Sequence, residues 1–97
     1  MRTPLLSDAE LEAALAELPD WERLDDRLAA QFRFESFVVA FAFMTEVAFH
    51  AERLDHHPEW SNVYNRVSIE LTTHDSGGLT ALDVELAQCV SRSAAAR

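Results

Sequence analysis

Cysteine, basic residues and long apolar runs are all scarce in this sequence of 97 residues. The single cysteine, Cys89, has no partner for a disulfide within the chain, and its helical surroundings predict a small buried apolar side chain. No window approaches the ~18 apolar residues of a membrane-spanning helix. The N-terminus turns acidic at Asp8, too early for a signal peptide. We therefore expect a cytoplasmic protein with no membrane partner.

Positive charge is also limited. Eight basic residues are scattered among 17 acidic ones, and the formal net charge is −9. A surface of this sign repels phosphate backbones, so the sequence gives no support for nucleic-acid binding. There is no internal repeat and no linker, and 48% of the residues are hydrophobic. We expect a single domain over residues 1–97.

Hydrophobic periodicity and turn residues predict a helix, two strands and a long helix in the first half of the chain. A capping box at residues 7–10 precedes a helix of about three turns. Residues 21–24 and 28–34 are typical of strands joined by a turn, and the second alternates apolar and other side chains. A capping serine then starts a helix over residues 36–55.

The long helix has a wider apolar surface than a helix packed on one side needs. Its main stripe comprises Phe37, Phe41, Met44 and Ala48. Phe43 and Val47 lie off this stripe, about 160° from its phenylalanines. We interpret the excess as a second packed side. A subunit interface and a helix sandwiched within the fold are both open.

The second half of the chain predicts two more strands and a last helix. Residues 60–64 and 67–73 have strand character, and Gly77 and Gly78 mark a turn. A helix over residues 80–90 follows, with a tail expected to fray. The order α-β-β-α-β-β-α predicts an α+β domain, in which a four-stranded antiparallel sheet has three helices packed on one face.

Three of the four histidines flank one strand-and-turn segment. His56 and His57 lie at the end of the long helix, and His74 follows the last strand. Histidine transfers protons near neutral pH without a metal. Glu52 precedes His56 by four residues, so the two are predicted to share a helix face and to touch. We expect the three imidazoles to line one pocket. Its flat walls would come from Trp21, Trp60 or Tyr64.

Other interpretations of these residues stay open on spacing alone. A zinc site is disfavoured because adjacent histidines rarely bind one ion and no His-x-x-x-His is present. A serine hydrolase lacks its Gly-x-Ser-x-Gly turn. His56 and His57 could simply oppose the negative end of the helix dipole, and Asp83 could simply be a helix-capping acid. His50, without a partner at helical spacing, is interpreted as structural.

The pattern of Glu52, His56-His57-Pro58, Tyr64, His74 and Asp83 resembles the signature of the pterin-4a-carbinolamine dehydratases, with matching spacings. Residues 41–45, 60–65 and 78–80 are also similar to family segments. The resemblance implies a hydro-lyase that converts 4a-hydroxytetrahydropterin to quinonoid dihydropterin and water in tetrahydrobiopterin recycling. That substrate is the product of pterin-dependent aromatic amino-acid hydroxylases, to which the chain would be functionally linked.

The resemblance also implies roles for single residues. It makes His56, His57 and His74 catalytic, with Glu52 and Asp83 in support. The residues expected to contact the pterin are Asp55, Thr72, Thr73, Asp75 and Trp21. No metal and no cofactor are implied, because the pterin is the substrate.

Family members form homodimers and homotetramers, and some are dimerization cofactors of a homeodomain transcription factor. The alternative function is therefore an oligomeric protein-binding module, similar to a transcriptional coactivator, that needs no catalysis. The wide apolar surface of the long helix is the sequence feature that favours it.

Overall fold

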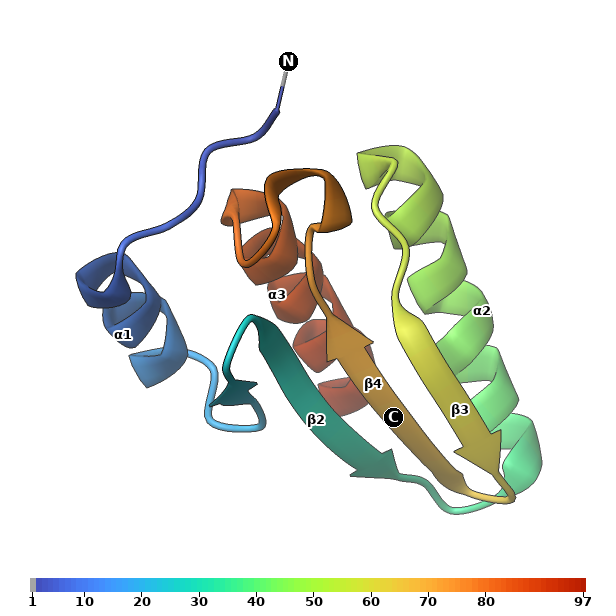
Figure 1. Ribbon diagram of the computed structural model, residues 1–97. Coiled ribbons are helices and arrows are strands. Elements are labelled where there is room, and N and C mark those ends of the chain that lie inside the picture. Colours follow the sequence, from blue (N-terminus) through green and yellow to red (C-terminus); the bar gives the residue numbers. More distant parts are fainter. Residues whose placement is uncertain (1) are drawn as a thin grey trace.

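Four strands form one antiparallel sheet in the computed structural model, which describes residues 2–97 (Figure 1). The helices are α1 (Asp8–Ala16), α2 (Phe37–Leu54) and α3 (Ala81–Ala95), and a 3-10 turn, η1, spans His74–Ser76. The strands are β1 (Glu22–Leu24), β2 (Arg27–Arg33), β3 (Glu59–Val63) and β4 (Arg66–Leu71), in the spatial order β1-β2-β4-β3. The predicted order of elements and the α+β class are confirmed.

The helices share one core on a single face of the sheet. Leu28 and Phe32 of β2 and Ile69 of β4 are buried against the helices, whereas Gln31 and Glu70 point to the other face, which is uncovered. This alternation is the expected result of a period of two residues with one apolar face. Figure 1 shows α2 and α3 behind the sheet and α1 beside it.

Helix α2 packs with the side opposite to its predicted main stripe. Its buried residues are Ala40, Phe43, Val47 and Ala51. Phe43 lies between Phe32 and Phe34, with ring centroids 5.6 Å and 4.7 Å away. The side chains left exposed are Phe37, Val38, Phe41 and Phe49. The predicted second packed side, with Phe43 and Val47, is the one that faces the sheet, and of the first stripe only Met44 packs against the core. Both stripes are apolar, so the contacts of Phe43 with β2 decide which one is buried.

Helix α3 is one turn longer than predicted. It continues to Ala95, and Ser93 in its last turn is buried. The Arg97 guanidinium donates to the carbonyl of Ser93 and forms an ion pair with Glu46 at 3.6 Å. The expected fraying of residues 91–97 was therefore wrong, because alanine favours the helix and α2 provides a partner for its end.

Candidate active site

Helix α2 ends so that two adjacent histidines diverge. Asp55 follows its last residue with left-handed backbone angles, φ 50° and ψ 45°. The backbone N–H groups of Asp55 and His56 donate back to the carbonyls of Glu52 and Ala51. This is the hydrogen-bonding pattern with which many helices end at a residue of left-handed conformation. As a consequence, His56 turns into the protein and His57 stays at its surface.

His56 is hydrogen-bonded to a buried carboxylate of α3. Its Nε2 lies 2.6 Å from Oδ1 of Asp83, which is fully buried. The other oxygen, Oδ2, accepts from the Thr73 hydroxyl at 2.8 Å and from the Thr80 backbone N–H at 2.9 Å. Because a carboxylate only accepts, Nε2 of His56 is the donor, and Nδ1 is its remaining ring nitrogen. Asp83 thus caps α3 and fixes His56 as well.

His57 pairs with Glu52, at 2.6 Å between Nε2 and Oε2. The sequence predicted instead that Glu52 would contact His56. That prediction was wrong because the helix ends at Leu54, so the spacing of four residues no longer sets which side chains meet. The left-handed residue at position 55 directs His57, not His56, toward the Glu52 carboxylate.

His74 begins the turn after β4 and contacts a carboxylate that sequence reasoning missed. Its Nε2 lies 3.2 Å from Oε2 of Glu59, the first residue of β3. The same oxygen accepts from Arg27 of β2 at 2.7 Å, and this hydrogen bond holds the pKa of Glu59 below its ordinary value. Thirty-two residues separate Arg27 from Glu59, so only the strand register brings them together.

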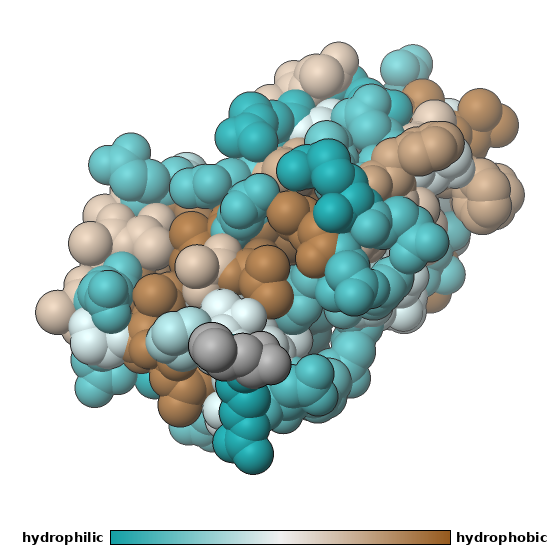
Figure 2. Space-filling model, turned by 90° about the horizontal axis from the view of Figure 1, so that it is seen from above, coloured by the Kyte–Doolittle hydropathy of each residue, from teal (hydrophilic) through white to brown (hydrophobic). Residues whose placement is uncertain are grey.

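The three imidazoles line one cavity of about 290 Å³ at this end of the sheet. Its lining residues are Arg2, Thr3, Asp55, His56, His57, Thr72, Thr73, His74, Asp75, Ser76 and Leu82. Seven of the ten residues proposed from the sequence are among them. Glu52 and Asp83 lie behind, bonded to His57 and His56. Figure 2 views this end of the molecule, where hydrophilic residues surround smaller apolar areas.

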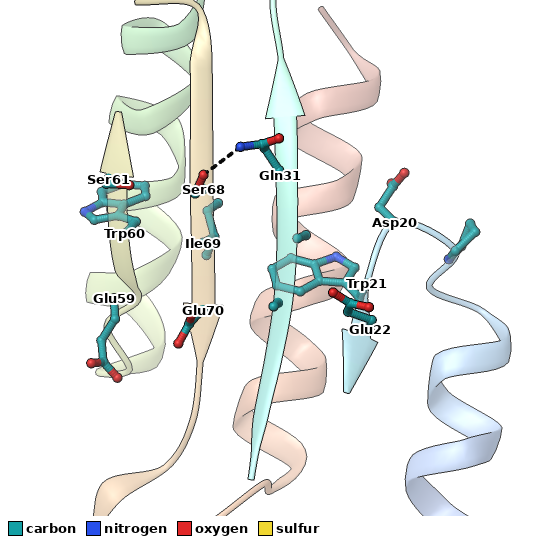
Figure 3. Close-up of a pocket in the computed structure, with 13 residues that line it drawn as sticks. Asp20, Trp21, Glu22, Gln31, Glu59, Trp60, Ser61, Ser68, Ile69 and Glu70 are labelled. Carbon is teal, nitrogen blue, oxygen red and sulfur yellow. Dashed lines mark hydrogen bonds between the residues drawn. The ribbon is translucent and has the colours of Figure 1, made fainter. Parts of the chain in front are cut away.

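The predicted aromatic walls lie elsewhere. Trp21 packs edge-on against Phe32, and its indole N–H donates to Ser91 at 2.9 Å. Trp21 and Trp60 line a separate groove of about 680 Å³ on the uncovered face of the sheet (Figure 3). Tyr64 lies in the turn at the far end of β3, with φ 53°. The prediction failed because adjacency along the chain does not place a side chain at the same end of a strand.

The structure also bears on metal binding and on contact with membranes. Between residues 2 and 97, no group of three or more histidine, cysteine, aspartate or glutamate side chains is arranged to hold a metal ion. Over the same residues, none of the helices is both long enough and apolar enough to cross a membrane.

Residues 4–93 match the protein family described as pterin 4 alpha carbinolamine dehydratase. A protein of Novosphingobium aromaticivorans named "Putative pterin-4-alpha-carbinolamine dehydratase" is 53% identical over 92 residues. The match covers 93% of this chain and 96% of that protein. One of the same name from Bordetella avium is 54% identical over 88 residues, with 89% and 82% covered. The crystal structure of a transcriptional coactivator/pterin dehydratase from Brucella melitensis has a TM-score of 0.89 and 41% identity, covering 93% of this chain and 98% of that one. The chain therefore belongs to the pterin-4-alpha-carbinolamine dehydratase family.

Proposed function

We propose that this protein is a hydro-lyase that removes water from 4a-hydroxytetrahydropterin to give quinonoid dihydropterin. The observation that carries the proposal is the convergence of His56, His57 and His74, from two separate chain segments, on one cavity. The names of the relatives and the family match support the same activity.

The reaction needs two proton transfers and no change of oxidation state in the protein. The bond from carbon 4a to its hydroxyl breaks while an acid protonates the leaving oxygen, which departs as water. A base removes the proton on nitrogen 5, and the nitrogen lone pair forms the new double bond to carbon 4a. A neutral and a protonated imidazole can do both near neutral pH, and such general acid–base help is worth ~10²–10⁴-fold.

All three histidines face a carboxylate with Nε2, so Nδ1 is the ring nitrogen that each leaves for these steps. We assign His57 to hold the pterin and to move the proton of nitrogen 5, and His56 and His74 to act on the hydroxyl. His56 would use Nδ1, because its Nε2 is bonded to Asp83. Asp83 and Glu52 would support catalysis by fixing the rings of His56 and His57.

The pterin would be bound largely by backbone groups. The Thr72 hydroxyl already donates to the carbonyl of Asp26 at 2.7 Å, and the Thr73 hydroxyl donates to Asp83. Both threonines nevertheless line the cavity, together with Asp55 and Asp75. Their peptide N–H and C=O groups are therefore the better candidates for contacts with the ring.

The replacement His57→Ala tests the assignment, with His50→Ala as the matched control. His57 is exposed, so its removal should leave the unfolding temperature near that of the unmodified protein. In stopped-flow assays with enzymatically generated carbinolamine, the dehydration rate should fall by ~10²–10⁴-fold, whereas His50→Ala should keep it. A full rate in His57→Ala would refute this role, and no acceleration by the unmodified chain would refute the function.

We also propose that the exposed apolar side of α2 holds the protein as a homodimer or homotetramer. Phe41 is 57% exposed and Phe49 is 74% exposed on this side, a large apolar surface for a free monomer. In sizing chromatography, Phe41→Glu should elute later than the unmodified chain. Leu24→Glu, at an exposed apolar site on β1, should not. The same side could dock a different protein, in which case the unmodified chain would elute as a monomer.

Within the cell, we propose a cytoplasmic role in tetrahydrobiopterin recycling beside a pterin-dependent aromatic amino-acid hydroxylase. The chemistry supports this place, because such hydroxylases release the carbinolamine that the reaction consumes. Adding the protein to a hydroxylase turning over its substrate should lower the amount of free carbinolamine. An unchanged amount would contradict the role.

A further inference from the structure

The carboxylate partner of His74 is itself held in place by a neighbouring strand. Each of the three histidines lies beside one carboxylate, but those of His56 and His57 come from helices and that of His74 comes from the sheet. We propose that Glu59, fixed by Arg27, is a positioning residue that orients His74 for proton transfer. The inference rests on the proposed function of the cavity.

The sheet places two carboxylates directly opposite each other at this point. Glu59 of β3 and Glu70 of β4 are paired residues in the strand register, and like charges in that arrangement repel. Arg27 reaches both, with its Nη1 atom 2.7 Å from Glu59 and 3.1 Å from Glu70. Figure 3 shows the two glutamates side by side on the uncovered face of the sheet. The positive charge of Arg27 therefore offsets the repulsion between the two carboxylates.

An ionised Glu59 determines which ring nitrogen of His74 carries a hydrogen. Glu59 lies 3.2 Å from Nε2 of His74, and its negative charge attracts an N–H there and repels a lone pair, so it favours the tautomer with the hydrogen on Nε2 and leaves Nδ1 for another partner. Neither Glu59 nor Arg27 lines the histidine cavity, so both would act only through His74.

Other ionisable groups surround His74 as well. Those that line the cavity with it are Arg2, Asp55, His56, His57 and Asp75. Among residues 2–97, however, Glu59 is the carboxylate within ion-pair distance of the His74 ring. Because both members of this pair are largely exposed, its contribution to folding stability is small. We therefore expect the effect of losing Glu59 to be on the reaction rate and not on the fold.

The replacement Glu59→Gln tests the inference, because it keeps the size of the side chain and removes its charge. We expect kcat to fall about fivefold with KM within about twofold, since Glu59 does not line the cavity. The ¹⁵N NMR signals of the His74 ring should also move toward a mixture of the two tautomers. Arg27→Met should change both quantities in the same direction. Glu70→Gln is the matched control, because Glu70 bonds Arg27 without contacting His74, and it should resemble the unmodified protein.

A double-mutant cycle with His74→Gln gives the decisive comparison. Glu59→Gln should lower kcat only when His74 is present, and rate losses that multiply in the double variant would overturn the inference. An unchanged His74 spectrum in Glu59→Gln would also overturn it. The spectrum does not depend on turnover. A chain without dehydratase activity would therefore refute the proposed function and still leave the contact between Glu59 and His74 open to measurement.

Discussion

The replacement Asp83→Ala removes a carboxylate that accepts three hydrogen bonds beside the cavity. Asp83 is fully buried and accepts hydrogen bonds from His56, Thr73 and the Thr80 backbone. Alanine would leave the His56 ring N–H and the Thr80 backbone N–H without an acceptor, whereas the Thr73 hydroxyl could donate to Thr80 Oγ1 at 2.8 Å. Each lost acceptor costs about 1–3 kcal/mol. Breaking a buried pair by removing one partner typically costs about 3–5 kcal/mol. We expect a loss of about that size, a large part of the ~5–15 kcal/mol that stabilises a domain.

The replacement Asp83→Asn separates stability from chemistry. Its amide oxygen can still accept from Thr73 and from the Thr80 backbone, so the free energy of unfolding should fall by only about 1–2 kcal/mol. The amide nitrogen would then face Nε2 of His56, which must become an acceptor, so the ring hydrogen moves to Nδ1. We expect kcat for dehydration to fall at least about tenfold in this variant, because the tautomer is wrong.

Urea unfolding followed by circular dichroism gives the free energies of unfolding for both variants and the unmodified chain. Dehydration rates are measured by stopped flow without urea and scaled to the folded fraction. An Asp83→Ala protein within about 1 kcal/mol of the unmodified chain would refute the energetic reasoning. An Asp83→Asn protein with unchanged kcat would refute the role of the tautomer.

Two further predictions concern Asp55 and Arg27. Because Asp55 has a positive φ, Asp55→Val should lose about 1–3 kcal/mol in urea unfolding, whereas Asp55→Gly should lose much less; equal losses would contradict this account. Because Arg27 lowers the pKa of Glu59, the Glu59 carboxylate takes up a proton more readily in the unfolded chain than in the folded one. The stabilisation by this pair is therefore present above about pH 4.5 and is lost as the pH falls through the pKa of Glu59 in the folded state. Arg27→Met should therefore lose less stability on acidification than the unmodified chain, as measured by thermal unfolding across acidic pH, and an unchanged acid profile would argue against the pair.

Local patterns predicted most of the fold because their causes are local. The capping box at Ser7 forms as expected, with the Glu10 backbone N–H donating to Ser7 at 3.1 Å and the Glu10 side chain accepting in return. The strict alternation in β4 predicted which of its side chains would be buried. Both depend on residues at most a few positions apart.

The remaining differences depend on packing between elements. Both stripes on α2 are apolar, so the periodicity of the sequence does not indicate which one is buried. Contact with the aromatic rings of β2 and its following residue decides that Phe43 is buried. The partner of Glu52 depends on a single left-handed residue at the end of the helix. Arg27 and Glu59 meet only through the order of strands in the sheet. None of these three can be derived from spacing along the chain.

The supporting carboxylates lie on three different elements, with Glu52 on α2, Glu59 on β3 and Asp83 on α3. Any proteolytic fragment that ends before α3 lacks the anchor of His56, and any that begins after α2 lacks the anchor of His57. Turnover should then disappear in a single step together with the tertiary structure as denaturant is added. Enzymatic activity would serve as a sensitive gauge of whether the whole chain is correctly folded.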